Sequence, residues 1–470
     1  MSEERAPLSL WDGVSVVVGI VVGVSLFKVP ATVFGNVETP LAGLGVWALG
    51  GLLSLIGALC YAELAAAWPH SGGDYVYLSR AYGPWLGFLF SWAQLVAILT
   101  GSIGAMAYVF ADYAAGLFGG GDTTAIAAAA IAAVTGWNLL GVTWGRRVQN
   151  TLTLTKIVGL AGVVAVGLFA LTHADATAAP AATAAQGGDV GFALVLVLYA
   201  YGGWSNAAFV ASEVRDPQRN VPHVLVLGTA AIAALYLIVN GAYLAALGFE
   251  GLRHAATPAA DVLAARLGET AGHVMSVLVM VSALGAIQGM VFTGARVYAS
   301  AGRDHAAFGA LARWSPRAEV PARALLAQAA VSLLWIVAVG TQLGRAALDG
   351  TLAALRLPPM PWDHFGGGFD TLVASTAPAF WLFMVATGAA LMALRRREPD
   401  APRPFRVPAY PWTPLLFCAS SLFMFEASLR YAGGLALAGL VPLALGVPLY
   451  LATRSRSSRV SSRDAGPAGR

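Results

Sequence analysis

The stretches Val21-Val22-Gly23-Val24-Ser25-Leu26-Phe27 and Tyr199-Ala200-Tyr201-Gly202-Gly203-Trp204-Ser205 each interrupt a long apolar segment with small residues. A helix tolerates such a break at bilayer depth only where neighbouring protein or a water-filled cavity satisfies the freed backbone groups. We therefore interpret the two stretches as the two halves of one substrate site.

The composition around these stretches is typical of a membrane protein with many spans. Of the 470 residues, 58% are hydrophobic and 11% are charged, and the mean hydropathy is +0.69. A helix needs roughly 20 apolar residues to cross the hydrocarbon layer. The sequence therefore predicts an all-α integral membrane protein with 12 transmembrane helices. The predicted spans are residues 11–34, 41–67, 85–117, 124–142, 148–171, 190–212, 223–247, 272–301, 321–343, 369–394, 412–430 and 433–452.

The net charge of +4 reflects topology rather than an acidic partner. Most arginines lie in or beside segments that are cytoplasmic if the N-terminus is cytoplasmic, and the positive-inside rule then places both termini in the cytoplasm of a cell (inner or plasma) membrane. The first apolar stretch exceeds signal-peptide length and has no small-residue cleavage site, so we expect no cleavable signal.

The spans suggest one membrane domain containing two repeats. Residues 1–10 form a cytoplasmic N-terminus, 11–171 the first repeat, 190–394 the second repeat and 412–452 two additional helices. Residues 454–470 form a basic, Ser-rich cytoplasmic tail that we expect to be disordered near anionic lipid.

The two breaks occupy matching positions in oppositely oriented spans. Gly23 and Gly202 each lie about a dozen residues into their span, roughly 18 to 20 Å deep at 1.5 Å per residue, from opposite faces. Paired interruptions of this kind indicate a transporter site within an inverted repeat. Either break alone is more typical of close helix packing.

Broken helices offer charges that suit a zwitterion. N–H groups that begin a helical half attract an anion, and carbonyl groups that end one suit a cation. We expect a carboxylate on the N–H groups of Val24, Ser25 and Leu26, and an ammonium on the carbonyl groups of Val21, Tyr199 and Ala200. The substrate side chain would face an aromatic wall of Tyr199, Tyr201 and Trp204, although aromatic residues at helical spacing are more often packing.

Lysine is confined to two positions, Lys28 and Lys156, and both lie inside apolar spans. A buried lysine shifts its pKa readily, whereas arginine stays protonated, and an ionisable residue within the membrane indicates function. We expect Lys156 to substitute for a bound cation and to bridge the broken first helix to the eighth span, with or without exchange of a proton; the alternative is a structural pair with carbonyl groups. Lys28 either has a role of this kind or extends to the external surface.

Other polar residues are less specific. Glu63 and Glu213 lie near cytoplasmic helix ends, where pairing with Arg80, Arg215 or Arg296 would form an inner gate. The histidines lack metal-ligand spacing, so no metal is expected. No nucleophile elbow, P-loop or dinucleotide-binding glycine pattern occurs in a suitable context. This argues against ATP-driven transport, most membrane enzymes and any cofactor.

Four motifs resemble the amino acid-polyamine-organocation (APC) superfamily, and within it the L-type amino acid transporters. The first is Gly23-Val24-Ser25-Leu26-Phe27, and the third is Tyr199-Ala200-Tyr201-Gly202-Gly203-Trp204. The second combines Cys60-Tyr61-Ala62-Glu63-Leu64 with Pro69, Ser71-Gly72-Gly73-Asp74-Tyr75 and Tyr82-Gly83-Pro84, and is similar to the end of the second helix and a re-entrant segment after it. The fourth is residues 213–222.

The resemblance implies a LeuT-type five-plus-five fold with broken helices 1 and 6, alternating access and amino acid transport. It places Lys156 on the fifth-helix lysine that replaces sodium in sodium-independent members, and Tyr199 on an aromatic gate. Two departures concern the substrate: Ser25 replaces a glycine and Lys28 replaces an apolar residue. The loop between the third and fourth spans has no cysteine, so no disulfide-linked heavy-chain subunit is expected.

The leading hypothesis is a sodium-independent secondary transporter of neutral amino acids, acting as an exchanger or a proton-coupled symporter. A polyamine or cationic amino acid carrier is a second hypothesis, but the two broken motifs contain no acidic residue. A non-transporting amino acid sensor is a third, and the sequence shows no appended signalling domain.

Overall fold

The computed structural model describes residues 10–11, 14, 23–68, 73–140, 159–170, 188–204, 214–315, 320–357, 359–360, 362, 365 and 367–464. Regular structure in these residues is helical throughout. The longer helices are α3 (Pro40–Ala67), α5 (Pro84–Ala93) with α6 (Leu99–Phe118), α7 (Thr123–Leu139), α10 (Pro217–Arg253), α12 (Glu269–Asp304), α13 (Ala322–Gly340), α15 (Gly368–Arg397), α16 (Trp412–Ala432) and α17 (Ala436–Asp464). The shorter ones are η1 (Val24–Phe27), α2 (Val29–Gly35), α4 (Asp74–Tyr82), Gly159–Ala170, α9 (Val190–Tyr201), α11 (Pro258–Leu267) and α14 (Gln342–Ala354).

Seven helices within the described residues are long and apolar enough to cross a membrane, and three shorter apolar helices accompany them. The seven coincide with predicted spans, so the all-helical membrane class is confirmed at this level. The twelve spans and the five-plus-five repeat remain predictions. α11 and α14 were not predicted.

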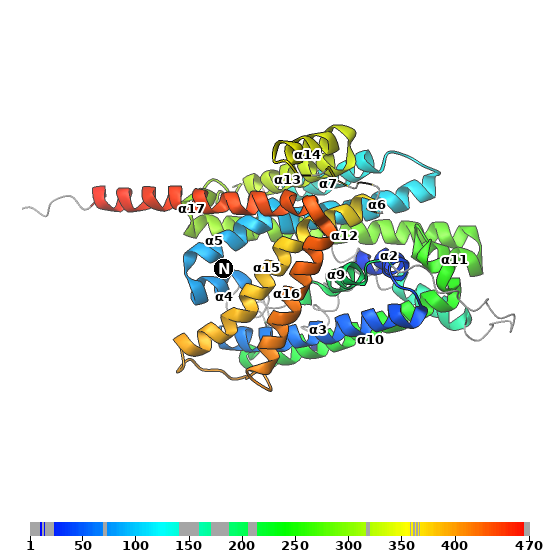
Figure 1. Cartoon of the computed structure of the whole chain (residues 1–470), viewed down its shortest axis with the longest axis horizontal. Coiled ribbons are helices and arrows are strands. Elements are labelled where there is room, and N and C mark those ends of the chain that lie inside the picture. Colours follow the sequence, from blue (N-terminus) through cyan, green and yellow to red (C-terminus); the bar gives the residue numbers. More distant parts are fainter. Residues whose placement is uncertain are drawn as a thin grey trace, which may run out of the picture.

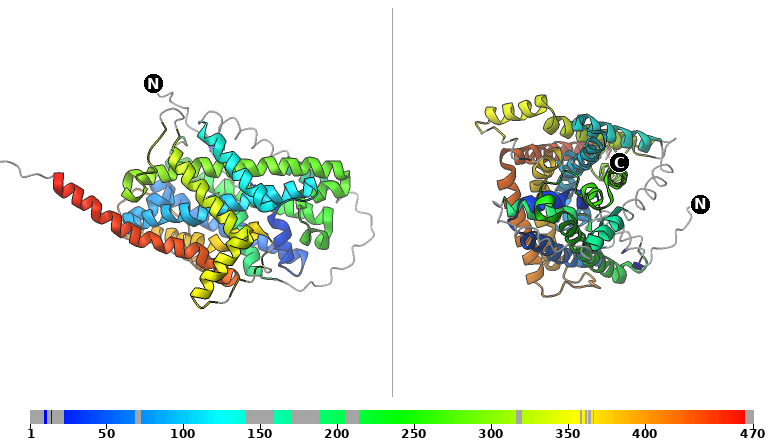
Figure 2. Two further views of the ribbon diagram at one scale, coloured as in Figure 1. Left: turned by 90° about the horizontal axis from the view of Figure 1, so that it is seen from above. Right: turned by 90° about the vertical axis from the view of Figure 1, so that its right-hand side faces the viewer.

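The C-terminal helix corrects one expectation. α17 continues beyond the predicted end at residue 452 to Asp464 and projects from the body of the molecule (Figures 1 and 2). Residues 453–464 contain neither glycine nor proline, and these are the residues that most strongly end a helix. This part of the tail is therefore helical rather than disordered.

Helices pack in pairs around a central region, and in two of the three main pairs the partners are distant in sequence. α3 lies beside α10, α6 beside α12, and α15 beside α16 (Figure 1). The short helices α2 and α9 lie between the first two pairs and contact each other. The two interrupted spans therefore occupy the middle of the molecule.

Side-chain caps explain where several helices begin. Thr39 accepts a hydrogen bond from Ala42 N at the start of α3, and Asp189 accepts one from Phe192 N at the start of α9, as helix N-caps do. Asn36, which follows α2, accepts a hydrogen bond from the backbone N–H of Asp189 at 3.0 Å. This contact joins the end of α2 to the start of α9.

Candidate functional site

The first span is broken at two points. Gly23 is extended (φ −110°, ψ 179°), the single 3₁₀ turn η1 follows, and Lys28 (φ −120°, ψ −49°) separates η1 from α2. Leu26 N donates to Gly23 O at 3.2 Å, so this N–H has an acceptor within the protein in this conformation. The N–H groups of Val24 and Ser25 have no acceptor among the described residues. The sequence therefore located the break, and within the described residues two of its three expected donors have no acceptor.

The sixth span is broken where the sequence predicted. α9 ends at Tyr201, Gly202 leaves the helical region (φ −53°, ψ 150°), and Gly203 has φ +105°. A positive φ of this size strongly favours glycine. Gly202 N donates to Tyr199 O at 2.9 Å. The helical ladder therefore stops at the glycine pair.

Tyr236 of α10 joins the two breaks. Its hydroxyl donates to Ala200 O at 2.9 Å and lies where it can accept from the N–H of Gly23. Two turns further along α10, Tyr243 donates to Leu26 O at 3.3 Å. These hydroxyls satisfy backbone groups that the broken helices leave free, as the membrane interior requires.

Sequence reasoning missed both tyrosines of α10. Their spacing of i and i+7 places them on one helix face, and this spacing is the signal that could have revealed them. A single tyrosine in an apolar run looks like ordinary packing, so each residue alone is uninformative.

The three expected aromatic residues point in different directions. Tyr199 packs edge-on against Phe369, with ring centroids 6.0 Å apart, and Trp204 packs against Tyr61 at 5.0 Å. Tyr201 is fully buried and donates to Trp47 O at 3.1 Å. They therefore do not form one wall, and Tyr199 and Trp204 line the sixth-span break on separate sides.

A small cavity adjoins the glycine pair. Gly202, Gly203 and Trp204 form one side, and residues of α3, α15 and α16 form the rest, including Ser54 and Ser421, whose buried hydroxyls lack partners in the described chain. Its volume of ≈ 20 Å³ is enough for about one water molecule. An amino acid does not fit there in this conformation.

Lys28 lies in a junction with α6 and the turn after α10. Its Nζ is 3.0 Å from Asp112 Oδ2 and donates to Ala256 O at 3.2 Å. The next residue of α6, Tyr113, donates to Phe27 O at 2.7 Å. We call these contacts the Lys28 junction: those of Lys28 with Asp112 and Ala256, and that of Tyr113 with Phe27. The side chain of Lys28 is 14% exposed, so it is held in the protein rather than extended to the surface.

Asp74, from the second motif, is buried in the first turn of α4. It accepts hydrogen bonds from Tyr61 and, at 2.8 Å, from Thr387 Oγ1. Burial raises the pKa of Asp74, and these two hydrogen bonds oppose the rise. Because Tyr61 also packs against Trp204, this carboxyl group is one side chain away from the sixth-span break.

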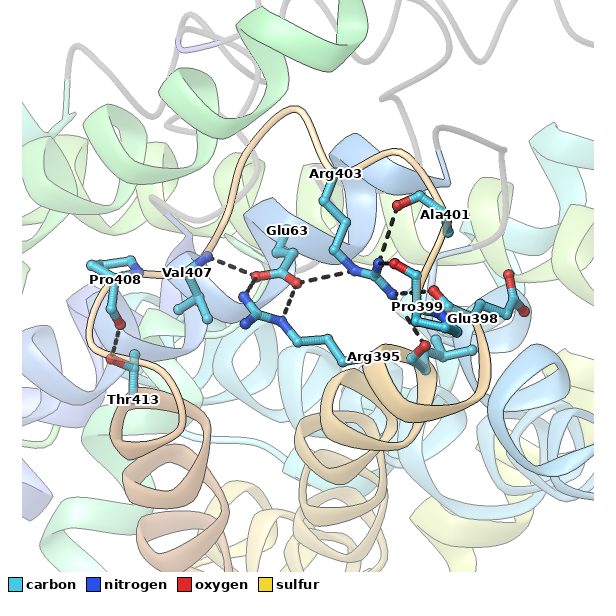
Figure 3. A network of polar contacts seen from close by, with 10 residues as sticks. Glu63, Arg395, Glu398, Pro399, Ala401, Arg403, Val407, Pro408 and Thr413 are labelled. Atoms are coloured by element: carbon cyan, nitrogen blue, oxygen red, sulfur yellow. Dashed lines mark hydrogen bonds and ion pairs between the residues drawn. The ribbon is translucent and has the colours of Figure 1, made fainter.

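Glu63 is the centre of an ionic network at the end of α3 (Figure 3). Arg395 of α15 donates to both of its carboxylate oxygens at 2.7 and 2.5 Å, Val407 N donates at 2.7 Å, and Arg403 lies 3.6 Å away. We call these four residues the Glu63 network.

The predicted partners of Glu63 were wrong. Arg80 pairs instead with Glu398, and Arg296 stacks on Phe292. The true partners follow the tenth predicted span, more than 300 residues along the chain, and no local pattern connects them with Glu63. Val21, Lys156 and Glu213 lie outside the described residues.

A family model for amino acid permeases matches residues 8–451. The chain belongs to the amino acid permease family. This permease is 29% identical to the b(0,+)-type amino acid transporter 1 of Mus musculus over 429 residues, which cover 89% of the chain and 82% of the relative. It is 28% identical to the serine/threonine exchanger SteT of Bacillus subtilis (strain 168) over 465 residues, which cover 97% and 98%.

A third relative, the cystine/glutamate transporter of Homo sapiens, is 26% identical over 458 residues, which cover 95% of this permease and 85% of the relative. The family and these relatives are transporters rather than enzymes. The resemblance found in the motifs is thus confirmed, and with it the multi-pass membrane class.

Proposed function

We propose that this permease is a sodium-independent secondary transporter of neutral amino acids that works by alternating access. The observation that carries the proposal is the bridge formed by Tyr236 between Gly23 and Ala200. It brings the two interrupted helices together, so that backbone groups of both breaks lie near one another. Such an arrangement suits a small zwitterion.

The substrate carboxylate would bind the free N–H groups of Val24 and Ser25. The carbonyl groups of Tyr199 and Ala200 each accept one hydrogen bond within the protein, and a carbonyl oxygen has a second lone pair. These lone pairs, with Val21 O, would receive the ammonium group. The substrate side chain would lie toward Tyr199 and Phe369.

Lys156 would take the place of a sodium ion beside the broken first span. The motif Thr153-Leu154-Thr155-Lys156 supports this role, because Lys156 within it resembles the fifth-helix lysine of sodium-independent members. A fixed positive charge there would make external sodium unnecessary, and transport would proceed by exchange or with protons.

The topology proposed with this function is a twelve-span, five-plus-five arrangement in the cell membrane, with both termini in the cytoplasm. The breaks of the first and sixth predicted spans, at Gly23 and Gly202, support it. We also propose that the permease works without a heavy-chain subunit, since its two cysteines, Cys60 and Cys418, both lie in helices.

Uptake of a panel of labelled amino acids into proteoliposomes tests the proposal. We expect uptake of neutral amino acids to be unchanged when sodium is replaced by choline, and to be lost in Lys156→Ala. Stimulation by internal unlabelled amino acid would indicate exchange. Dependence on sodium, or unchanged transport by Lys156→Ala at every pH, would contradict the proposal.

A cationic amino acid or polyamine carrier is the second candidate. The structure places two carboxylates, Asp112 and Asp370, close to Lys28 beside the first break, which the two broken motifs alone did not indicate. Preferential uptake of arginine or putrescine in the same panel would favour this candidate over the first.

A further inference from the structure

One lysine serves two carboxylates at the point where α2, α6 and α15 meet. Lys28 is bonded to Asp112 near the end of α6, and it also acts electrostatically on Asp370 in the first turn of α15. Asp261 of α11 is a third carboxylate within electrostatic reach of Lys28. Among the described residues, negative charge therefore exceeds positive charge around Lys28.

Asp370 is the carboxylate left without a counter-ion of its own. Its residue is 3% exposed, and its Oδ1 atom has no hydrogen-bond partner in the part of the chain that the structure describes. Thr32 of α2 lies beside the carboxyl group. The titratable groups that interact with it are Lys28, Asp112 and Tyr431 of α16. Lys28 is already committed to Asp112, and Asp112 repels Asp370.

The position of Asp370 connects it with both breaks. The preceding residue, Phe369, packs against Tyr199 in the last turn of α9 before Gly202. Thr32 and Lys28 belong to the short segment that begins at the first break. A movement of α2 away from α6 would therefore change the surroundings of Asp370.

A buried carboxylate without a counter-ion is strongly disfavoured, and a bound proton removes its charge. The proton also turns one carboxyl oxygen into a hydrogen-bond donor. We propose that Asp370 is a proton-binding group of the transport cycle. It holds a proton while Lys28 is paired with Asp112 and releases it to water when α2 moves and frees Lys28.

This inference rests on the proposed transport function and selects proton coupling among its modes. The only bond that changes is the O–H bond of the Asp370 carboxyl group, which forms with a proton taken from the aqueous phase on the side of α2 and breaks when that proton returns to water. No oxidant, reductant or metal takes part.

Infrared difference spectroscopy of the full chain in nanodiscs, across a pH series, reads this proton directly. We expect the carbonyl band of a protonated carboxyl group in the wild type and its loss in Asp370→Asn. Asp349→Asn is the matched control, because Asp349 of α14 accepts hydrogen bonds from Met360 N and Trp362 Nε1, and it should keep the band. Lys28→Met should move the titration of the band to higher pH, because the positive charge that acts on Asp370 among the described residues is lost.

In proteoliposomes, we expect Asp370→Asn to lose the stimulation of uptake by a pH gradient and to keep exchange without a gradient. An identical band and titration in the wild type and Asp370→Asn would overturn the proposal. The proposal would also be overturned if Asp370→Asn changed only the preference of uptake between lysine and leucine, because Asp370 would then bind the substrate cation. A band that depends on Asp370 in a protein that takes up no amino acid would support the proton site and contradict the transport function.

Discussion

Single hydroxyl groups satisfy the backbone where the two interrupted helices meet. Tyr236 contacts both breaks, and its ring is fixed by packing against Trp47 and Tyr201, with centroids 5.5 and 4.8 Å away. The hydroxyl and the ring therefore have separate roles, and the first can be removed while the second is kept.

Tyr236→Phe should fold and lose most transport. Removing the hydroxyl leaves Gly23 N and Ala200 O without this partner, at a cost of about 1–3 kcal/mol, and loosens the geometry of the two breaks. The matched control is Tyr298→Phe, since Tyr298 of α12 is equally buried and donates to Gln94 O in the segment between α5 and α6. Thermal stability in detergent should fall by similar amounts in the two variants, whereas initial uptake rates should fall in Tyr236→Phe alone. Equal transport in both variants would contradict this role.

Gly203→Ala tests the sixth-span break. A Cβ atom at φ +105° costs about 1–3 kcal/mol, and relief of this strain would shift the backbone that the substrate contacts. We expect lower apparent substrate affinity in uptake kinetics. Gly241→Ala, within α10 and with nothing within 4 Å of the added Cβ, should leave transport unchanged. Equal uptake kinetics in the two variants would mean that transport does not depend on the break at Gly203.

Pairs of helices are fixed by a few buried polar contacts. Asn138 of α7 donates to Gln288 Oε1 of α12 at 2.6 Å, and Gln288 donates back to Asn138 Oδ1 at 3.0 Å. Each amide satisfies the other, so the pair aligns the two helices without a net charge.

A double-mutant cycle should expose this coupling between α7 and α12. Asn138→Leu or Gln288→Leu alone leaves one buried amide without its amide partner and should lower stability by about 1–3 kcal/mol, whereas the double variant should recover part of the loss. The recovery is partial because Trp137 Nε1, which also donates to Gln288 Oε1, loses its partner whenever Gln288 is replaced. Melting temperatures of the four proteins in one detergent supply the measurement. Additive losses would mean that the two amides do not act together.

The Glu63 network ties α3 to α15 and to the loop that follows it (Figure 3). Glu63→Gln leaves Arg395 and Arg403 without their anion, and breaking a buried ion pair in this way costs about 3–5 kcal/mol. The exposed pair of Glu426 and Arg430 offers the control, because solvent-exposed ion pairs contribute little to stability. Glu63→Gln should therefore melt well below Glu426→Gln, and equal melting temperatures would refute this role for the network.

For the molecule as a whole, the apolar spans and both breaks could be predicted because each depends on one continuous segment of the sequence. α3 and α9 begin within a residue of their predicted starts, and α9 ends at the glycine pair. Length and hydropathy suffice for such features.

The contacts of the site could not be predicted because they join distant segments. Tyr236, the Asp112 partner of Lys28 and the Arg395 partner of Glu63 come from separate helices, and each side chain is ordinary in its own surroundings. The aromatic wall failed for the same reason: helical spacing gives the direction of a side chain only once the neighbours of the helix are known.

An experimental structure of the full chain with a bound neutral amino acid tests the central claim most directly. The account predicts interruptions at Gly23 and Gly202, the ligand carboxylate on the N–H groups of Val24 and Ser25, and the ligand ammonium beside Ala200 O. A ligand bound elsewhere, or continuous helices through both glycines, would contradict it.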